Sequence, residues 1–208
     1  MSREVVVVDY GVGNVHSVQK ALEHEGGRVS LSSDPEQVSR ADRLLLPGVG
    51  AFGDGMRELG RRGLVEPIRE FVKSGRPFMG ICLGMQLLLG ESEEFGPHQG
   101  LGFIPGKVIA IKPRSGFKVP QVGWASIAPI TEAGWVTSPL QDVPVGTRFY
   151  FVHSFTAAPD DERHRLADTV YGGCRVSAAV RHENIVGFQF HPEKSGLMGL
   201  QILARFLT

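Results

Sequence analysis

Cysteine is scarce in this sequence, and neither sign of charge is in excess. Cys82 and Cys174 are the two cysteines among 208 residues, which is too few for a disulfide framework, and their spacing is not that of metal ligands. Their number permits one Cys82–Cys174 bridge, but the reduced thiols of the cytosol make free cysteines the expectation. Lys plus Arg and Asp plus Glu both number 22, so no overall field favours nucleic acid or an anionic membrane as a partner.

Long apolar runs are also missing. The Val5–Val8 run ends at Asp9 and is too short for the core of a signal peptide or for a membrane span, and the other apolar runs are of strand length. The sequence therefore predicts a cytoplasmic protein with no membrane partner. It contains no repeat, linker or low-complexity segment, and 208 residues can bury a sizeable core, so we predict one domain over residues 1–208.

The first half of the chain alternates between short apolar strands and segments whose apolar residues have helical spacing. Strands that are apolar on both faces and alternate with helices indicate a parallel sheet covered on both sides. The expected strands are Glu4–Asp9, Arg28–Leu31, Arg43–Leu46 and Pro77–Cys82. The expected helices are Asn14–Glu25, a turn from Asp34-Pro35, Met56–Ser74 with a break near Gly63, and one that opens over Met85–Leu89.

After residue 100 the expected strands follow one another through short turns, which favours antiparallel or mixed pairing. These strands are Lys107–Ile111, Arg148–Phe155, Leu166–Tyr171, Val176–His182 and Ile185–Phe190, and a final amphipathic helix covers Leu197–Phe206. The prediction is an α/β fold. Its mostly parallel central sheet carries helices on both faces, and an antiparallel or mixed portion belongs to the second half.

The segment Gly80–Gly84, with the sequence GICLG, is the strongest chemical signal. A strand leads into it and a helix follows, as in a nucleophile elbow with Cys82 in place of serine. The tight turn needs glycine on both sides, and a helix N-terminus favours the thiolate, which is the reactive form. Cys82 is therefore the candidate nucleophile of an acyl-transfer enzyme; the alternative is a small buried cysteine in a glycine-flanked turn.

The segment FQFHPE places a candidate base and its orienting carboxylate at the end of a strand. Pro192 favours an extended conformation for the residue before it, so His191 and Glu193 can share a face. The pattern fits a triad in which Glu193 orients His191 and His191 takes the proton of Cys82. A surface histidine beside a solvated glutamate is the alternative. His153 is the main competitor, with a supporting or substrate-side role, and the other five histidines of the seven fit solvated or capping positions.

Two backbone N–H groups are candidates for the oxyanion hole. One belongs to Leu83, directly after the nucleophile. The other belongs to Gly50, in the glycine-rich loop that follows the third expected strand; this loop lacks the Lys-Ser/Thr ending of a phosphate-binding loop. A plain tight turn remains the alternative for Gly50. The similar loop at Gly11–Asn14 could equally contact a partner.

Together these segments resemble the class I glutamine amidotransferases, in the order PGVG, GICLGMQ and HPE, over almost the whole chain. The resemblance implies a flavodoxin-like fold and a Cys82–His191–Glu193 triad that hydrolyses glutamine to glutamate and ammonia, without a cofactor or metal. It also implies glutamine-binding roles for Gln86 and for Glu94, the latter toward the α-amino group. Ser154, in the YFVHSF segment, is a further expected substrate-binding residue.

Within that family, the segments DYGVGNVHSV, PGVGAFGDGM, QVGW and HPEKSG are similar to the glutaminase subunits of imidazole glycerol phosphate synthases, of histidine biosynthesis. This implies a heterodimer with a (β/α)8-barrel cyclase subunit that receives the ammonia. Asn14, Trp124 and Lys194 are the expected interface residues. Ala125 stands where these subunits usually have Asn, and Phe155 where they usually have Tyr, so the local contacts there are open.

Two other classes of function compete with this interpretation. The first is another cysteine enzyme, either a peptidase or a different amidotransferase subunit. The second is a degenerate, non-enzymatic scaffold, which the presence of all three triad residues disfavours. A regulatory hypothesis also follows: the flexible Gly48–Gly50 loop sets its N–H groups correctly only when the partner is occupied.

Overall fold

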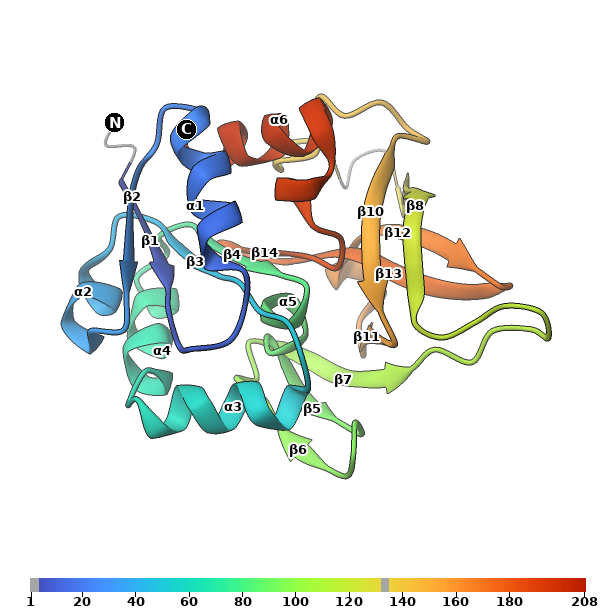
Figure 1. Ribbon diagram of the computed structural model, residues 1–208, viewed down its shortest axis with the longest axis horizontal. Helices are drawn as coiled ribbons and strands as arrows, with labels where there is room; N and C mark the ends of the chain where they lie inside the picture. The colour runs from blue at the N-terminus through green and yellow to red at the C-terminus, as the bar shows by residue number, and fades with distance from the viewer. Residues whose placement is uncertain (1–3, 132–134) are drawn as a thin grey trace.

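A central eight-stranded sheet organises the chain, with the strand order β2-β1-β3-β4-β14-β13-β12-β9 (Figure 1). The computed structural model describes residues 4–131 and 135–208. The first five strands in that order pair in parallel. They are β2 (Arg28–Ser32), β1 (Glu4–Val8), β3 (Leu44–Leu46), β4 (Phe78–Ile81) and β14 (Ile185–Phe188).

The remaining strands of this sheet pair antiparallel, as the second half of the sequence predicted. They are β13 (Cys174–His182), β12 (Arg165–Tyr171) and β9 (Ala128–Pro129). The predicted α/β fold with a parallel core and an antiparallel extension is therefore confirmed.

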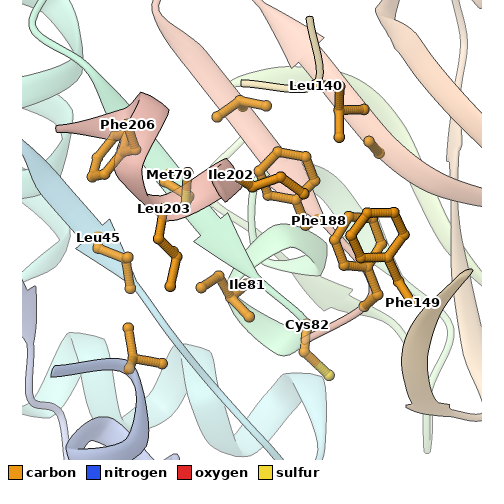
Figure 2. Packing of buried hydrophobic residues seen from close by; sticks show 14 of the residues in the cluster. Leu45, Met79, Ile81, Cys82, Leu140, Phe149, Phe188, Ile202, Leu203 and Phe206 are labelled. Carbon is orange, nitrogen blue, oxygen red and sulfur yellow. The ribbon is translucent and has the colours of Figure 1, made fainter. Parts of the chain in front are cut away.

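Helices cover both faces of the parallel part (Figure 1). Leu45, Met79 and Ile81 pack in one apolar cluster with α1 (Val15–His24) and α6 (Gly196–Phe206), and Figure 2 shows these strand residues beneath α6. Leu44, Leu46 and Phe78 pack in a second cluster with the helices of the opposite face. Those helices are α2 (Pro35–Arg40), α3 (Phe52–Arg61) and α4 (Val65–Lys73). Alternate residues of each strand therefore face opposite layers, which explains the continuous apolar runs.

Two smaller sheets stand beside the central one. One pairs β8 (Gln121–Ser126) with β10 (Arg148–His153), and the other has the order β11-β7-β5-β6. The latter strands are β11 (Phe155–Pro159), β7 (Ile104–Ala110), β5 (Leu89–Ser92) and β6 (His98–Gln99). The predicted single strand Arg148–Phe155 is wrong, because the chain passes at Ser154 from the β8 partner to the β7 partner. The strands β5, β6, β8 and β9 were not predicted.

The helical predictions need smaller corrections. The break near Gly63 is confirmed, and Gly63 takes a φ of 67° between α3 and α4, but α3 begins earlier than expected, at Phe52. The helix after Cys82, α5, covers only Leu83–Gln86, and Leu89 already belongs to β5. Among the described residues, no helix combines the length and the apolar character needed to cross a membrane.

Candidate active site

Cys82 lies at the turn between β4 and α5, in a backbone conformation that non-glycine residues rarely adopt. Its φ is 54° and its ψ is −112°. Its N–H donates to the Phe188 carbonyl of the neighbouring strand at 2.7 Å. A Cβ atom on Gly80 would lie 2.7 Å from the Gly84 oxygen, and one on Gly84 would lie 1.8 Å from the Leu46 oxygen. Both glycines are therefore required by close backbone packing. Because α5 has four residues, the expected help from a helix dipole is small.

His191 and Glu193 follow β14 and enter the short 3-10 helix η3 (Pro192–Lys194). The His191 Nδ1 lies 2.8 Å from the Glu193 Oε1, and the two side chains are 4% and 2% exposed. The His191 backbone is held on both sides, because its N–H donates to the Tyr150 carbonyl at 3.0 Å and its carbonyl accepts from the Ser195 hydroxyl at 2.6 Å. Since Nδ1 faces a carboxylate, it keeps its proton there, and Nε2 is the ring nitrogen that can exchange a proton with another group.

A cavity of about 320 Å³ opens over Cys82. It is lined by Val49, Gly50, Cys82, Leu83, Gln86, Glu94, Pro120, Val152, His153, Ser154, Phe155 and His191. The structure thus brings the predicted nucleophile, base, oxyanion and substrate-binding residues to one cavity. Glu193 does not line the cavity and contacts His191 from the side away from it.

The two histidines of the cavity have opposite tendencies to carry charge. Burial opposes a positive charge on His191, but its interactions with Cys82 and Glu193 outweigh this and raise the pKa to about 9. Burial lowers the pKa of His153 to about 4, against a hydrogen bond to the Phe155 carbonyl. The arrangement therefore favours an imidazolium at His191 beside the Cys82 sulfur, with a neutral imidazole at His153.

The oxyanion geometry differs from the prediction for Leu83. The Leu83 N–H is not free, because the Gly48 carbonyl accepts its hydrogen bond at 3.4 Å. Tyr10 packs against the loop that contains Gly48, and its hydroxyl donates to the Pro47 carbonyl at 2.9 Å. A Cβ atom on Gly48 would lie 2.4 Å from that hydroxyl oxygen. Burial raises the pKa of Tyr10, so it stays a neutral donor. Gly50 has a φ of 97° and lines the cavity.

The two side chains expected to bind glutamine, Gln86 and Glu94, already form hydrogen bonds within the chain. The Gln86 Nε2 donates to the Phe155 carbonyl at 3.2 Å and to the Gln189 Oε1 at 3.0 Å. The Glu94 Oε2 accepts from the Phe52 N–H at 2.7 Å, at the start of α3. Each of these two side chains therefore has one end anchored while the residue lines the cavity.

The three expected interface residues are exposed, although they come from separate elements. Asn14 caps α1 by accepting from the Ser17 N–H at 3.3 Å. Trp124, on β8, is 47% exposed and packs edge-on against Tyr150, with ring centroids 6.3 Å apart. Lys194 lies in η3, next to the candidate orienting carboxylate.

Sequence reasoning assigned no role to Gln189, which is fully buried and donates its Nε2 to the Cys82 sulfur at 3.7 Å. The available signal was its place between Phe188 and Phe190, since an amide inside an apolar run requires buried partners. Both cysteines are free thiols, and the Cys174 sulfur faces the Lys112 carbonyl at 2.7 Å. Among residues 4–131 and 135–208, no group of three or more His, Cys, Asp or Glu is arranged to hold a metal.

The fold, the turn that carries Cys82 and the His191 that shares its cavity are typical of glutamine amidotransferases. Comparison with known proteins supports this class. The chain belongs to the class I glutamine amidotransferase family, whose model, described as "Glutamine amidotransferase class-I", matches residues 6–208. A relative from Legionella pneumophila (strain Lens), "Imidazole glycerol phosphate synthase subunit HisH 1", is 48% identical over 98% of both chains. A Rhodopirellula baltica relative, named as the HisH subunit of the same synthase, is 45% identical over 98% of this chain and 97% of its own.

Solved structures extend the same comparison to the fold. "Structure of PurLQS from Thermotoga maritima" superposes with a TM-score of 0.74 at 21% identity, covering 100% of this chain and 98% of that one. "Trypanosoma brucei CTPS - glutaminase domain with bound acivicin" gives a TM-score of 0.64 at 16% identity, over 98% and 93% of the two chains. At these identities the likeness shows the fold alone.

Proposed function

We propose that this chain is the glutaminase subunit of an imidazole glycerol phosphate synthase, hydrolysing L-glutamine to glutamate and ammonia for a cyclase subunit. The observation that carries the chemistry is the strained Cys82 in one cavity with His191, whose Nδ1 lies 2.8 Å from Glu193. The similarity to synthase subunits over nearly the full length supports a role in histidine biosynthesis. The chain acts as one domain over residues 1–208, because the first and last parallel strands share one sheet.

The proposed reaction begins from the pair of the Cys82 thiolate and the His191 imidazolium, which forms when the thiol proton passes to Nε2 and which the raised pKa of His191 favours. The thiolate attacks the side-chain amide carbon of glutamine and forms a tetrahedral oxyanion. Collapse of this intermediate breaks the C–N bond as His191 returns its proton to the nitrogen, which releases ammonia and leaves a thioester. His191 then takes a proton from water, the hydroxide attacks the thioester, and glutamate leaves as the thiol is restored. Glu193 holds the imidazole in the required tautomer and stabilises its charge.

The oxyanion is stabilised in this proposal by the N–H groups of Leu83 and Gly50. For Leu83 this requires the Gly48 carbonyl to turn away, because that carbonyl now accepts the Leu83 N–H. The Glu94 carboxylate faces the α-ammonium group of the substrate, and Gln86 and Ser154 contact the rest of the glutamine; all three residues line the cavity.

The cyclase docks over the cavity side in the proposed heterodimer and contacts Asn14, Trp124 and Lys194. Ammonia released into water would be protonated and lose its nucleophilicity, so a partner must receive it directly. The exposed Trp124 is the kind of aromatic residue that anchors protein interfaces. Two free thiols agree with a reducing compartment, and we place the complex in the cytoplasm.

Glutamate release from glutamine, measured with and without the cyclase, tests this function. We expect release in the complex and its loss in Cys82→Ala, which keeps the fold because a smaller side chain replaces the thiol. Cys174→Ala is the matched control and should retain activity, since Cys174 lies outside the cavity lining. Absence of glutamate under both conditions, or full activity in Cys82→Ala, would exclude the proposal. Cleavage of peptides without cyclase would favour a peptidase.

A further inference from the structure

Gln189 is a polar side chain enclosed by an apolar core. It follows β14, is 0% exposed, and lies between Phe188 and Phe190, which both belong to the cluster shown in part in Figure 2. Its backbone N–H donates to the Ala178 carbonyl at 2.9 Å and so continues the pairing of β14 with β13. Burying an amide is unfavourable unless its groups are hydrogen-bonded, so the partners of Gln189 indicate its role.

A chain of hydrogen bonds determines which end of Gln189 faces Cys82. The Phe155 carbonyl can only accept, so Gln86 must present its Nε2 there, at 3.2 Å. The same nitrogen lies 3.0 Å from Gln189, which must therefore present its oxygen to Gln86. The remaining end of Gln189, the Nε2 donor, then lies 3.7 Å from the Cys82 sulfur. The opposite orientation would place two donors against each other.

We propose that Gln189 is a positioning residue that donates a hydrogen bond to the sulfur of Cys82, with Gln86 holding its amide in the donating orientation. An N–H bound to one side of the sulfur leaves the thiol proton to the other side, where the Val152 carbonyl lies 4.0 Å from the sulfur and the His191 imidazole shares the cavity. When that proton moves to His191, the bond becomes charge-assisted and strengthens. It weakens again in the thioester, whose sulfur carries little charge. Gln189 thus favours the thiolate without contacting the substrate.

The test measures alkylation of Cys82 by iodoacetamide across pH, in a Cys174→Ser background that leaves one thiol. Gln189→Met keeps the length of the side chain but removes the donor, and Gln189→Glu keeps the shape. We expect both curves to move to higher pH by about one to two units, which is the effect of a roughly 10- to 100-fold weaker ionisation. Gln86→Met should shift the curve less, since it removes only the group that orients Gln189.

Asn184→Leu is the matched control, because Asn184 is a partly buried amide at the start of β14 whose Nδ2 donates to the Val72 and Arg76 carbonyls, away from Cys82. It should leave the alkylation curve in place. A wild-type curve in either Gln189 variant with an unchanged circular dichroism spectrum would overturn the proposal. The inference rests on Cys82 as the proposed nucleophile, but alkylation needs no glutamine turnover. A failure of the glutaminase assay and a failure of this test are therefore separate results.

Discussion

At the scale of single residues, the cavity places two buried imidazoles in opposite states. His191 and His153 both line it, yet only His191 has a carboxylate, Glu193, within hydrogen-bond distance. His153 instead donates its Nδ1 to the Phe155 carbonyl at 2.8 Å, and burial keeps its ring neutral. A neutral ring at His153 avoids electrostatic repulsion of an imidazolium at His191. The HPE motif was enough to distinguish His191 from His153, because the carboxylate partner of His191 lies only two residues further along the chain.

The pH dependence of stability should report the charge on His191. Its pKa is raised to about 9 in the folded chain, above the ordinary value of 6.5, so the folded state binds this proton more tightly than the unfolded state. The resulting stabilisation is fully present below about pH 6.5 and is lost as the pH rises through 9. We expect the difference in unfolding free energy between the wild type and His191→Gln to shrink over this range.

Urea denaturation of both chains at several pH values between about 6 and 10, which bracket the ordinary and the raised pKa, measures this difference. Asn184→Leu changes no titratable group and provides the control, because its difference from the wild type should not follow the titration of a histidine. A difference between wild type and His191→Gln that stays constant with pH would contradict the raised pKa.

At the scale of elements, the β4–α5 elbow depends on backbone contacts that leave no room for side chains. Gly84→Ala would place a Cβ atom 1.8 Å from the Leu46 carbonyl oxygen. The oxygen is a backbone atom, and the Cβ atom is bonded directly to the backbone. Neither can move without displacing β3 or α5. We expect a loss of about 2–4 kcal/mol in unfolding free energy, typical of severe overpacking in a core, together with loss of glutaminase activity.

Gly60→Ala is the matched control for this substitution. Gly60 lies inside α3, and a Cβ atom there meets nothing within 4 Å. Alanine is the better helix former, so the variant should gain roughly 0.5–1 kcal/mol. Equal unfolding midpoints for the two variants in urea would show that the close approach at Gly84 is not a constraint.

Elements differ in how far local sequence determines them. The parallel strands were predictable because both faces are buried, and this produces continuous apolar runs such as Val5–Val8. The strands β5 and β8 were missed because their apolar residues are interrupted by Gly90 and Gly123 and their partners lie elsewhere in the chain. The occupied Leu83 N–H could not be predicted, since the orientation of a peptide group beside Gly48 depends on tertiary contacts.

At the scale of the whole molecule, the cavity is assembled from parts that belong to different sheets. Cys82 follows β4 of the central sheet, Val152 and His153 belong to β10 of the two-stranded sheet, and Phe155 begins β11 of the third. A partner that contacts β8, which pairs only with β10 among the described residues, would therefore act on the strand that carries one wall of the cavity. The exposed Trp124 lies on that strand. We therefore expect docking on β8 to affect the cavity through β10.

The central-sheet side of the cavity holds the Leu83 N–H, which donates to the Gly48 carbonyl at 3.4 Å. Loss of one oxyanion donor slows acyl transfer by about 10²- to 10³-fold. The isolated chain should therefore hydrolyse glutamine more slowly, by about this factor, than its complex with the cyclase and the cyclase's nucleotide ligand. Steady-state glutamate release over a range of glutamine concentrations, measured for the chain alone, with cyclase, and with cyclase plus ligand, gives the comparison. Since the proposed contact of the substrate with Glu94 does not involve the Gly48 carbonyl, the increase should fall on kcat and leave KM nearly unchanged. Equal rates in the three states would mean that the peptide after Gly48 turns freely and that the partner only collects ammonia.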